Sequence, residues 1–512
     1  MAITLPEIKE LKEYLVSSYH QRRIAQQEEE ETFYNDTFSV PWIKDESNIV
    51  RTGKAARMID GPAEHIITNN PQVFRYPSRE KKSEDAAQRV GGELNRWAKI
   101  LMRQQPQPFK EHAKQQLKRG EAWIYLPHND DYDPDNPLDL PVNFIIPDST
   151  VVFLDPEGTD ALGCPKRLIV TFERVASEVH RNYPEWAWRK RSNKKWSDTI
   201  PFMMYFDEEN RYFEADSDAL LNDEDGEIWG GTGIQPNIYG FVPFVHCYSG
   251  FGSASADGDP ANLAVGRLRW VKDLLREQTA IRSVINTLTY KFAYKSIDII
   301  YDASQGSPPT GDIGEKYSRG LNAMNVIGVP PNTEIKVSQD QLPDAQLFQH
   351  LYNIEKQIDV EDPLGTYDQP LGTSGRQQDI AQSSGLKRYE TVVDNTANSF
   401  ASAFGLAMRL CEKLKKLYPK DLKAGDIGGN YDCEIRLRAE DPMSQDRLRM
   451  LGSRLYQQQE IDLETNLTEY QGFTQEEAQN IMAKILVDNV TRNNPIVADI
   501  LGRQMAKEAG LE

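Results

Sequence analysis

Apolar residues recur every three or four positions over several long stretches, a spacing that places them on one face of a helix. The first stretch begins at Thr4, where Pro6 suits an early helical position and Glu7 completes a capping box. The run QQEEEE at 26–31 has no apolar member, so we expect it to form a solvated helix face. A second amphipathic helix is expected over 84–101, and its apolar stripe is Val90, Leu94, Trp97 and Leu101.

From about residue 121 to residue 252, short runs of β-branched and aromatic residues replace the helical pattern, as is typical of strands. Acidic or proline-rich loops separate these runs. The predicted strands are EAWIYL (121–126), VNFIIP (142–147), TVVFLD (150–155), RLIVTFERV (167–175), FMMYFDE (202–208), RYFEAD (211–216) and a closing strand within FVPFVHCYSGFG (241–252). Together with the helical stretches, they predict an α+β protein that is mostly α.

Helical periodicity returns at Asp259 and Pro260, which make a good helix start, and it continues to about Ser296. At 1.5 Å per residue this helix would be roughly 50 Å long. Its apolar stripe is Leu268, Val271, Leu275, Ile281, Ile285, Leu288 and Phe292. An insert rich in Gly and Pro follows at 297–342, and a second helix is expected over 343–360. The strand-like runs of the insert are IDIIYD (297–302), NVIGV (325–329) and EIKVS (334–338).

The last third of the chain begins with a polar loop at 361–376, which is rich in Gly and Pro. A very long helical pattern follows over 377–417, in which Gly385 and Gly405 are candidate kinks. A strand is expected within 431–440, and the rest of the chain is predicted to be helical. Five segments therefore follow one another: a long helix, a small insert, a shorter helix, a polar loop and a very long helix.

Length and charge narrow the classes of function. A chain of 512 residues exceeds one ordinary core, so two or more domains are expected. Lys and Arg number 59 and Asp and Glu number 78, which gives a formal charge of −19. Such acidity argues against tight wrapping of nucleic acid, although an acidic wall suits a surface past which DNA slides. No run of 18 apolar residues and no signal peptide are found, so we expect a cytoplasmic protein without a membrane span.

No motif for catalysis or for cofactor binding stands out. Gly53 and Lys54 lack the upstream glycine and the following Ser or Thr of a phosphate loop, which disfavours an ATPase. GGTG at 230–233 is predicted to be a turn. The acidic loop at 222–227 lacks the ligand spacing of a calcium loop, so a solvated loop is expected, with weak cation binding left open. We therefore expect no enzyme, no cofactor and no metal site.

The cysteines and histidines are dispersed along the sequence. The four cysteines have no paired spacing, which makes a disulfide framework or a zinc site improbable. His246 and Cys247 are adjacent, and neighbouring residues of a strand point to opposite faces. We therefore interpret them as packing residues rather than as a catalytic pair.

The first long helix is locally basic. Between Asp259 and Asp298, seven basic and four acidic side chains leave an excess of three positive charges. This excess is consistent with an ordinary solvated helix face or with weak, salt-dependent attraction to DNA phosphates. The residues that would carry the attraction are Arg276, Arg282, Lys291 and Lys295.

The order of these segments resembles the portal proteins of tailed bacteriophages. Three blocks carry the local likeness, and they begin IVRTGKAARM (49–58), ANLAVGRLRW (261–270) and SGRQQDIAQS (374–383). The resemblance covers most of the chain and implies the portal fold. Its expected parts are an N-terminal region and β-rich wing (1–258), a first stem helix (259–296), a small α/β clip (297–342), a second stem helix (343–360), a tunnel loop (361–376), a tunnel helix that returns to the wing (377–440) and an α-helical crown (441–512).

The resemblance also implies a function and a set of partners. About twelve copies would form a ring at one capsid vertex of the virion, around a channel through which double-stranded DNA is packaged and ejected. The ring would assemble in the host cytoplasm with the major capsid and scaffolding proteins. The clip would bind the large terminase first and the head–tail adaptor later. Its implied contact residues are Asp312, Glu315, Lys316 and Arg319, and those of the tunnel loop are Asp362, Gly365, Tyr367, Asp368, Gly372, Ser374 and Arg376.

Two other classes of function remain open at this point. Another connector or capsid assembly protein would lack the order helix, insert, helix, loop and long helix. An enzyme, such as a nuclease bound to the packaging machinery, would need clustered carboxylates that bind a metal ion.

Overall fold

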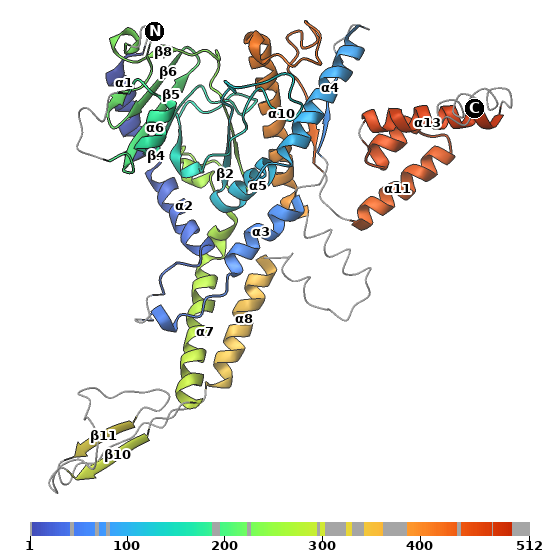
Figure 1. Cartoon of the computed structure of the whole chain (residues 1–512). Coiled ribbons are helices and arrows are strands. Elements are labelled where there is room, and N and C mark those ends of the chain that lie inside the picture. Colours follow the sequence, from blue (N-terminus) through green and yellow to red (C-terminus); the bar gives the residue numbers. More distant parts are fainter. Residues whose placement is uncertain are drawn as a thin grey trace, which may run out of the picture.

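A computed structural model shows an α+β protein in which helices predominate, as the sequence predicts. The described residues are 3–40, 43, 46–66, 71–77, 82–186, 195–222, 227–293, 297–302, 324–329, 343–361, 387–437, 442–473 and 475–493. Figure 1 shows a body of sheets and helices, from which two long helices project. A short pair of strands lies beyond the far end of these two helices, and a further group of helices lies to one side of the body.

The largest sheet of the body is antiparallel and has long central strands. Its strands are β3 (Val152–Leu154), β4 (Arg167–Val175), β5 (Thr199–Asp207), β6 (Asn210–Ala215), β7 (Asp218–Ala219) and β8 (Gln235–Pro236). Side chains alternate between its two faces. Ile169, Met203 and Tyr205 face the N-terminal helix, whereas Leu168 and Met204 face the main core. Both faces of the sheet are therefore covered.

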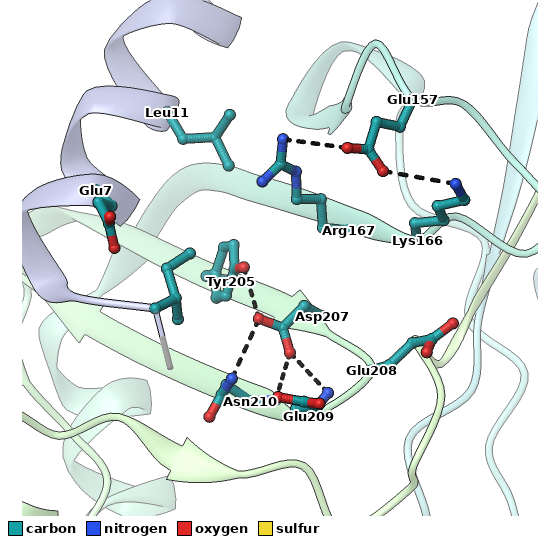
Figure 2. A pocket seen from close by; sticks show the side chains of 11 residues that line it. Glu7, Leu11, Glu157, Lys166, Arg167, Tyr205, Asp207, Glu208, Glu209 and Asn210 are labelled. Atoms are coloured by element: carbon teal, nitrogen blue, oxygen red, sulfur yellow. Dashed lines mark hydrogen bonds and ion pairs between the residues drawn. The ribbon is translucent and has the colours of Figure 1, made fainter. Parts of the chain in front are cut away.

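The N-terminal helix α1 (Leu5–Tyr14) packs on one face of this sheet. It starts with the predicted capping box, in which the backbone N–H of Thr4 donates to the Glu7 carboxylate at 2.7 Å. A π-helical turn, η1 (Leu15–Tyr19), leads into α2 (Gln21–Tyr34). An open pocket of about 640 Å³ lies between α1 and the turn that joins β5 to β6 (Figure 2).

The main core fills the space between the large sheet, a two-stranded sheet and several helices. Its further elements are α3 (Lys54–Ile66), α4 (Lys82–Leu101), α5 (Pro108–Arg119), β2 (Glu121–Tyr125), α6 (Ala176–Asn182), β9 (Phe244–Tyr248) and α10 (Glu390–Lys413). β2 and β9 pair antiparallel. Phe400 of α10 stacks on Phe109 of α5 with ring centroids 4.0 Å apart, and Phe404 meets Trp97 of α4 edge-on. Within the predicted long helix at 377–417, the described α-helix is thus α10, which packs one face into the core and ends at Lys413.

Gly405 does not interrupt α10, although the sequence suggested a kink there. A Cβ atom at this position would lie 2.7 Å from the backbone oxygen of Tyr431, closer than real contacts of this kind. The glycine therefore allows the chain that follows the helix to cross close to it.

The C-terminal helices join the body through a pair of short strands. β1 (Gln72–Phe74) pairs antiparallel with β12 (Glu434–Arg436). The Gln72 side chain also donates to the backbone oxygen of Gly472 at 2.9 Å. The elements that follow β12 are α11 (Pro442–Gln457), α12 (Leu463–Thr465), the π-helical turn η11 (Asn466–Tyr470) and α13 (Gln475–Asn493). The end of the chain is helical where it is described, as predicted.

The projection is a helical hairpin that points away from the body (Figure 1). Its elements are the 3₁₀ turns η6 (Pro260–Asn262) and η7 (Arg267–Trp270), α7 (Lys272–Ala293), the strands β10 (Ile297–Asp302) and β11 (Met324–Val329), and α8 (Ala345–Glu361). β10 and β11 pair in parallel. The predicted strands at 297–302 and 325–329 and the second predicted helix are confirmed, whereas the predicted strand at 334–338 lies outside the described residues.

The prediction of a single helix over 259–296 is wrong at its start. Asp259 caps only the short turn η6, and α7 begins at Lys272, so the helix is about 33 Å long rather than 50 Å. The backbone of Gly266 is extended between the two turns. A Cβ atom there would lie 2.4 Å from the backbone oxygen of Lys118. Close packing against α5 therefore breaks the helix at a point where local periodicity predicts that it continues.

Two further local predictions are corrected by the structure. VNFIIP at 142–147 is not a strand, because only Val142 and Ile145 make isolated bridges. The acidic run at 26–31 is not a solvated face, because Gln27 and Glu30 are fully buried. The GGTG segment is a turn, as predicted. The remaining 3₁₀ turns are η2 (Glu46–Asn48), η3 (Ser149–Val151), η5 (Trp229–Gly231), η9 (Lys387–Tyr389) and η10 (Lys415–Leu417).

Candidate functional site: the helical projection and its attachment

An apolar contact between the two helices of the projection continues the main core. Leu275 and Ala280 of α7 and Ile354 and Ile358 of α8 are each less than a tenth exposed. All four belong to the apolar cluster that fills the body. Full burial of a side chain such as Ile354 stabilises the fold by about 1.5–3 kcal/mol. The end of the hairpin nearest the body is therefore part of the core and not a loose appendage.

Polar contacts join α7 to α8 on both edges of the hairpin. On one edge, the Glu355 carboxylate accepts hydrogen bonds from Arg282 Nε at 3.0 Å and from Gln278 Nε2 at 3.2 Å. On the other edge, His350 Nε2 lies 3.0 Å from Glu277 Oε1. These contacts fix the relative rotation of the two helices.

The acidic run of α2 holds the base of the projection. Glu30 Oε1 accepts from Arg269 Nε of η7 at 2.6 Å, and the Glu30 side chain is only 1% exposed. Glu29 pairs with Lys272 and with Arg276 of α7. Successive acidic residues of α2 thus bind successive basic residues at the start of the projection.

The next acid of the same run faces the body. Glu31 Oε2 lies 2.9 Å from Lys118 Nζ and 2.7 Å from Arg119 Nη2 at the end of α5. The sequence alone does not reveal this role, because Lys118 and Arg119 lie far from Glu31 along the chain. The sequence gives one hint of this role: the acidic run at 26–31 and the basic start of the first long helix carry opposite charges.

A second attachment comes from the chain around the start of α3. Lys54 Nζ lies 2.5 Å from Asp359 Oδ1 of α8. The backbone N–H of Val50 donates to the Ser283 hydroxyl of α7 at 2.8 Å, and Ser283 is fully buried. Both helices of the projection are therefore tied to the body by polar contacts as well as by the core.

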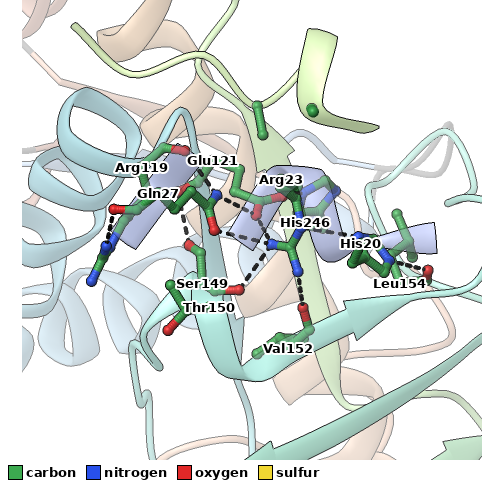
Figure 3. Close-up of polar contacts among 12 residues, drawn as sticks. His20, Arg23, Gln27, Arg119, Glu121, Ser149, Thr150, Val152, Leu154 and His246 are labelled. Atoms are coloured by element: carbon green, nitrogen blue, oxygen red, sulfur yellow. Dashed lines mark hydrogen bonds and ion pairs between the residues drawn. The ribbon is translucent and has the colours of Figure 1, made fainter. Parts of the chain in front are cut away.

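α2 is itself anchored by a buried polar network, which Figure 3 shows. Arg23 forms an ion pair with Glu121 of β2 and donates to the backbone oxygen of Val152 at 2.8 Å. Glu121 also accepts from Gln27 at 2.9 Å and lies 3.0 Å from His246 Nε2 of β9. Burial raises the pKa of Glu121, but Arg23, His246 and Gln27 outweigh it and lower the pKa to about 2. The network therefore fixes the helix that holds the projection.

The structure brings together a cysteine and a histidine that the sequence keeps far apart. Cys247 Sγ lies 3.7 Å from His112 Nε2, a geometry that a nucleophile and its base can have. Burial raises the pKa of the Cys247 thiol to about 12 and lowers the pKa of His112 to about 3. Both groups are thus neutral near pH 7, and the thiolate that a nucleophile needs is absent. The contact between Cys247 and His112 is therefore a packing contact, as the sequence predicts for Cys247. His246 points instead to the buried network around Glu121.

Several polar side chains that line the pocket beside α1 are bonded to one another. Figure 2 shows that Asp207 accepts from the Tyr205 hydroxyl at 2.7 Å and from the backbone N–H of Glu209 at 2.7 Å. Arg167 lies 2.7 Å from Asp155 and 3.9 Å from Glu157. The polar side chains of this pocket therefore hold the β5–β6 turn and the end of β4 in place.

The basic residues predicted on the first stem helix are partly engaged within the chain. Arg276 pairs with Glu29 and Asp273, and Arg282 pairs with Glu355. Lys291 lies in the last turn of α7. The predicted positions outside the described residues are Lys295, Asp312, Glu315, Lys316, Arg319, Asp362, Gly365, Tyr367, Asp368, Gly372, Ser374 and Arg376.

Among the described residues, no group of three or more His, Cys, Asp or Glu side chains is placed to hold a metal ion. None of the helices that the structure describes combines the length and the apolar character that a membrane crossing requires.

Neither the models of known protein families nor the curated proteins contain a match to this chain.

Proposed function

We propose that this chain is the portal protein of a tailed bacteriophage, a ring of about twelve copies at one vertex of the capsid. Double-stranded DNA passes through the centre of the ring during packaging and ejection. The ring assembles in the host cytoplasm with the capsid and scaffolding proteins. It binds the large terminase during packaging and the head–tail adaptor afterwards.

One observation carries the proposal. α7 and α8 form a hairpin that projects from a body of sheets and helices, with β10 and β11 beyond its far end (Figure 1). The same elements follow one another along the sequence in the order that a stem and clip require. In the proposal, the hairpin is the stem, the segment between its helices is the clip, and the large sheet belongs to the wing.

The surface of the projection supports a role in assembly. Val284 and Tyr290 of α7 and Phe348, Tyr352 and Val360 of α8 are all more than 40% exposed. Large apolar side chains that gather on one exposed element mark a surface that binds another protein. In a ring, neighbouring copies cover this surface.

The charge of the protein supports a role as a conduit. The formal charge of −19 weakens the attraction to phosphates, and Arg276 and Arg282 are already paired with acids of the chain. DNA in contact with such a surface is held weakly and can move.

Native mass spectrometry with negative-stain imaging of the full-length protein tests the proposal. Closed rings of about twelve copies with a central hole are the expected result. A stable monomer or a closed dimer at all concentrations would contradict it. Robust hydrolysis of ATP or DNA that one carboxylate substitution abolishes would favour an enzyme instead.

A further inference from the structure

The two lateral edges of the helical hairpin differ in chemistry. On one edge, Glu277, Ile281 and Val284 of α7 lie at helical spacings of four and three residues, beside Leu347 and His350 of α8. The polar contact between Glu277 and His350 lies on this edge. We call it the groove edge.

The opposite edge carries aromatic side chains. Phe348, Tyr352 and Glu355 of α8 lie at helical spacings of four and three residues, and Glu355 bonds Arg282 and Gln278 of α7. The side chains of Phe348 and Tyr352 are each 50% exposed. We call this the aromatic edge.

The groove edge has room for side chains of that size. A groove of about 670 Å³ lies there, and its wall is largely apolar. The apolar lining residues are Ile43, Ala280, Ile281, Val284 and Leu347. Burial of one aromatic side chain covers roughly 150–250 Å² of surface. The apolar wall of the groove therefore offers surface against which such a ring can be buried.

We propose that Phe348 and Tyr352 of one copy of this chain bind in the groove edge of the next copy. The inference rests on the proposed function, because it names the surfaces through which neighbours in the ring meet. The occupant is therefore a second copy of the chain, and its aromatic edge is the part that enters the groove.

Charge supports the same pairing. The aromatic edge is basic at Lys356, whose Nζ lies 4.6 Å from the centre of the Tyr352 ring. The rim of the groove carries Asp273, whose side chain is 82% exposed, and Glu277, which is 44% exposed. Lys356 of one copy thus faces Asp273 and Glu277 of the next. Arg276 also lines the groove, but it is already paired with Glu29 and Asp273.

The positions of the two surfaces explain why assembly gives a ring and not a dimer. Groove and aromatic edge lie on opposite sides of one hairpin, so a single contact leaves a free groove on one copy and a free aromatic edge on the other. Such head-to-tail contacts add further copies until the rotation closes.

Cysteine pairs test the contact directly in the full-length protein. The double variant Val284→Cys with Phe348→Cys, treated with a short thiol cross-linker, should give covalent multimers up to the whole ring. Each single variant should give none. In the matched control, Val284→Cys is combined with Asn353→Cys. Asn353 is exposed and adjacent to Tyr352, but it lies about 100° further around α8, so this pair should not link.

The outcomes separate this inference from the proposed function. The inference would be overturned if rings form but the cysteines at 284 and 348 do not link, or if the cysteines at 284 and 353 link equally well. Either outcome would leave the portal proposal intact. Absence of rings from the unmodified protein would overturn the proposed function and the inference with it.

Substitutions of the same surfaces give an independent test. Phe348→Ala with Tyr352→Ala should raise the protein concentration needed for ring assembly by at least about tenfold, without loss of helical signal, because both side chains are half exposed. Lys356→Glu should weaken assembly, and the added Asp273→Lys should restore it. Unchanged assembly in the aromatic variant, or no recovery by the second charge, would contradict the proposed contact.

Discussion

Glu30 of α2 and Arg269 of η7 are 239 residues apart in the sequence, yet Arg269 Nε donates to Glu30 Oε1 at 2.6 Å. Burial raises the pKa of Glu30, and the attraction of Arg269 offsets only part of that effect. The contact joins α2 to the chain just before α7. It therefore fixes where the projection leaves the body.

The cost of breaking this pair depends on what replaces the carboxylate. Glu30→Ala leaves the Arg269 charge largely buried without its partner, and we expect the free energy of unfolding to fall by roughly 3 kcal/mol. Glu30→Gln keeps an acceptor for Arg269 Nε and removes a charge whose burial is unfavourable, so its effect should be clearly smaller. Urea unfolding of both variants measures the difference, and equal losses would show that the charge of Glu30, and not its hydrogen bond, holds the contact.

Two buried histidines should make the fold sensitive to mild acid. Burial lowers the pKa of His20 and of His112 to about 3, below the ordinary value of 6.5. Each histidine therefore contributes stability that is present above about pH 6.5 and is lost as the pH falls toward 3. The loss should approach about 1.4 kcal/mol per pH unit for each histidine.

The measurement is the urea midpoint of the native protein and of His112→Gln at about pH 7 and about pH 5. The variant should lose less stability between the two conditions than the native protein. An equal loss of stability in the native protein and the variant would show that His112 becomes protonated without unfolding.

The cysteines should be unreactive in the folded protein. Burial raises the pKa of Cys164, Cys247 and Cys433 to about 12 and also raises the pKa of Cys411. Little thiolate is therefore present at neutral pH. Iodoacetamide should label the native protein very slowly and all four cysteines rapidly in urea. Fast labelling of Cys247 in the native state would reopen the question of a reactive pair with His112.

Two glycines inside helices should respond in opposite ways to alanine. Gly405→Ala places a Cβ atom 2.7 Å from the backbone oxygen of Tyr431, and we expect a loss of roughly 1–3 kcal/mol. Gly92 in α4 is exposed, and a Cβ atom there would meet nothing within 4 Å. Gly92→Ala should therefore stabilise the protein by up to about 1 kcal/mol, because alanine favours the helix. Thermal unfolding of both variants distinguishes the packing effect from helix propensity.

The proposed tunnel loop gives a functional prediction. Deletion of residues 362–375 should leave rings intact and impair DNA packaging or retention, because the deletion spares α8 and α10. Imaging of the rings and a packaging assay with the variant measure the two effects separately. Normal packaging and retention would remove this loop from the proposed mechanism.

Local patterns in the sequence were enough to predict much of the fold. The strand predicted at 167–175 is β4 with the same bounds, and the run at 297–302 is β10. The capping box of Thr4 and Glu7 also forms as expected. In each case neighbouring residues determine the structure, because alternation and capping depend on residues a few positions apart.

The features that sequence analysis missed depend on distant parts of the chain. Nothing near Glu30 indicates burial, since its partner Arg269 belongs to another segment. His112 and Cys247 are 135 residues apart and meet only in the folded core. The break in the predicted helix at Gly266 likewise arises from contact with α5. Local periodicity contains no information on such contacts.

The close approach of Gly266 to α5 has a mechanical consequence. Backbone lies directly against backbone there, so Gly266 itself adds no side chain that could yield at the joint between body and projection. Arg269 and Lys272 brace the same joint against α2. A twist applied at the far end of the hairpin would therefore reach the body as torque instead of being absorbed by bending at its base.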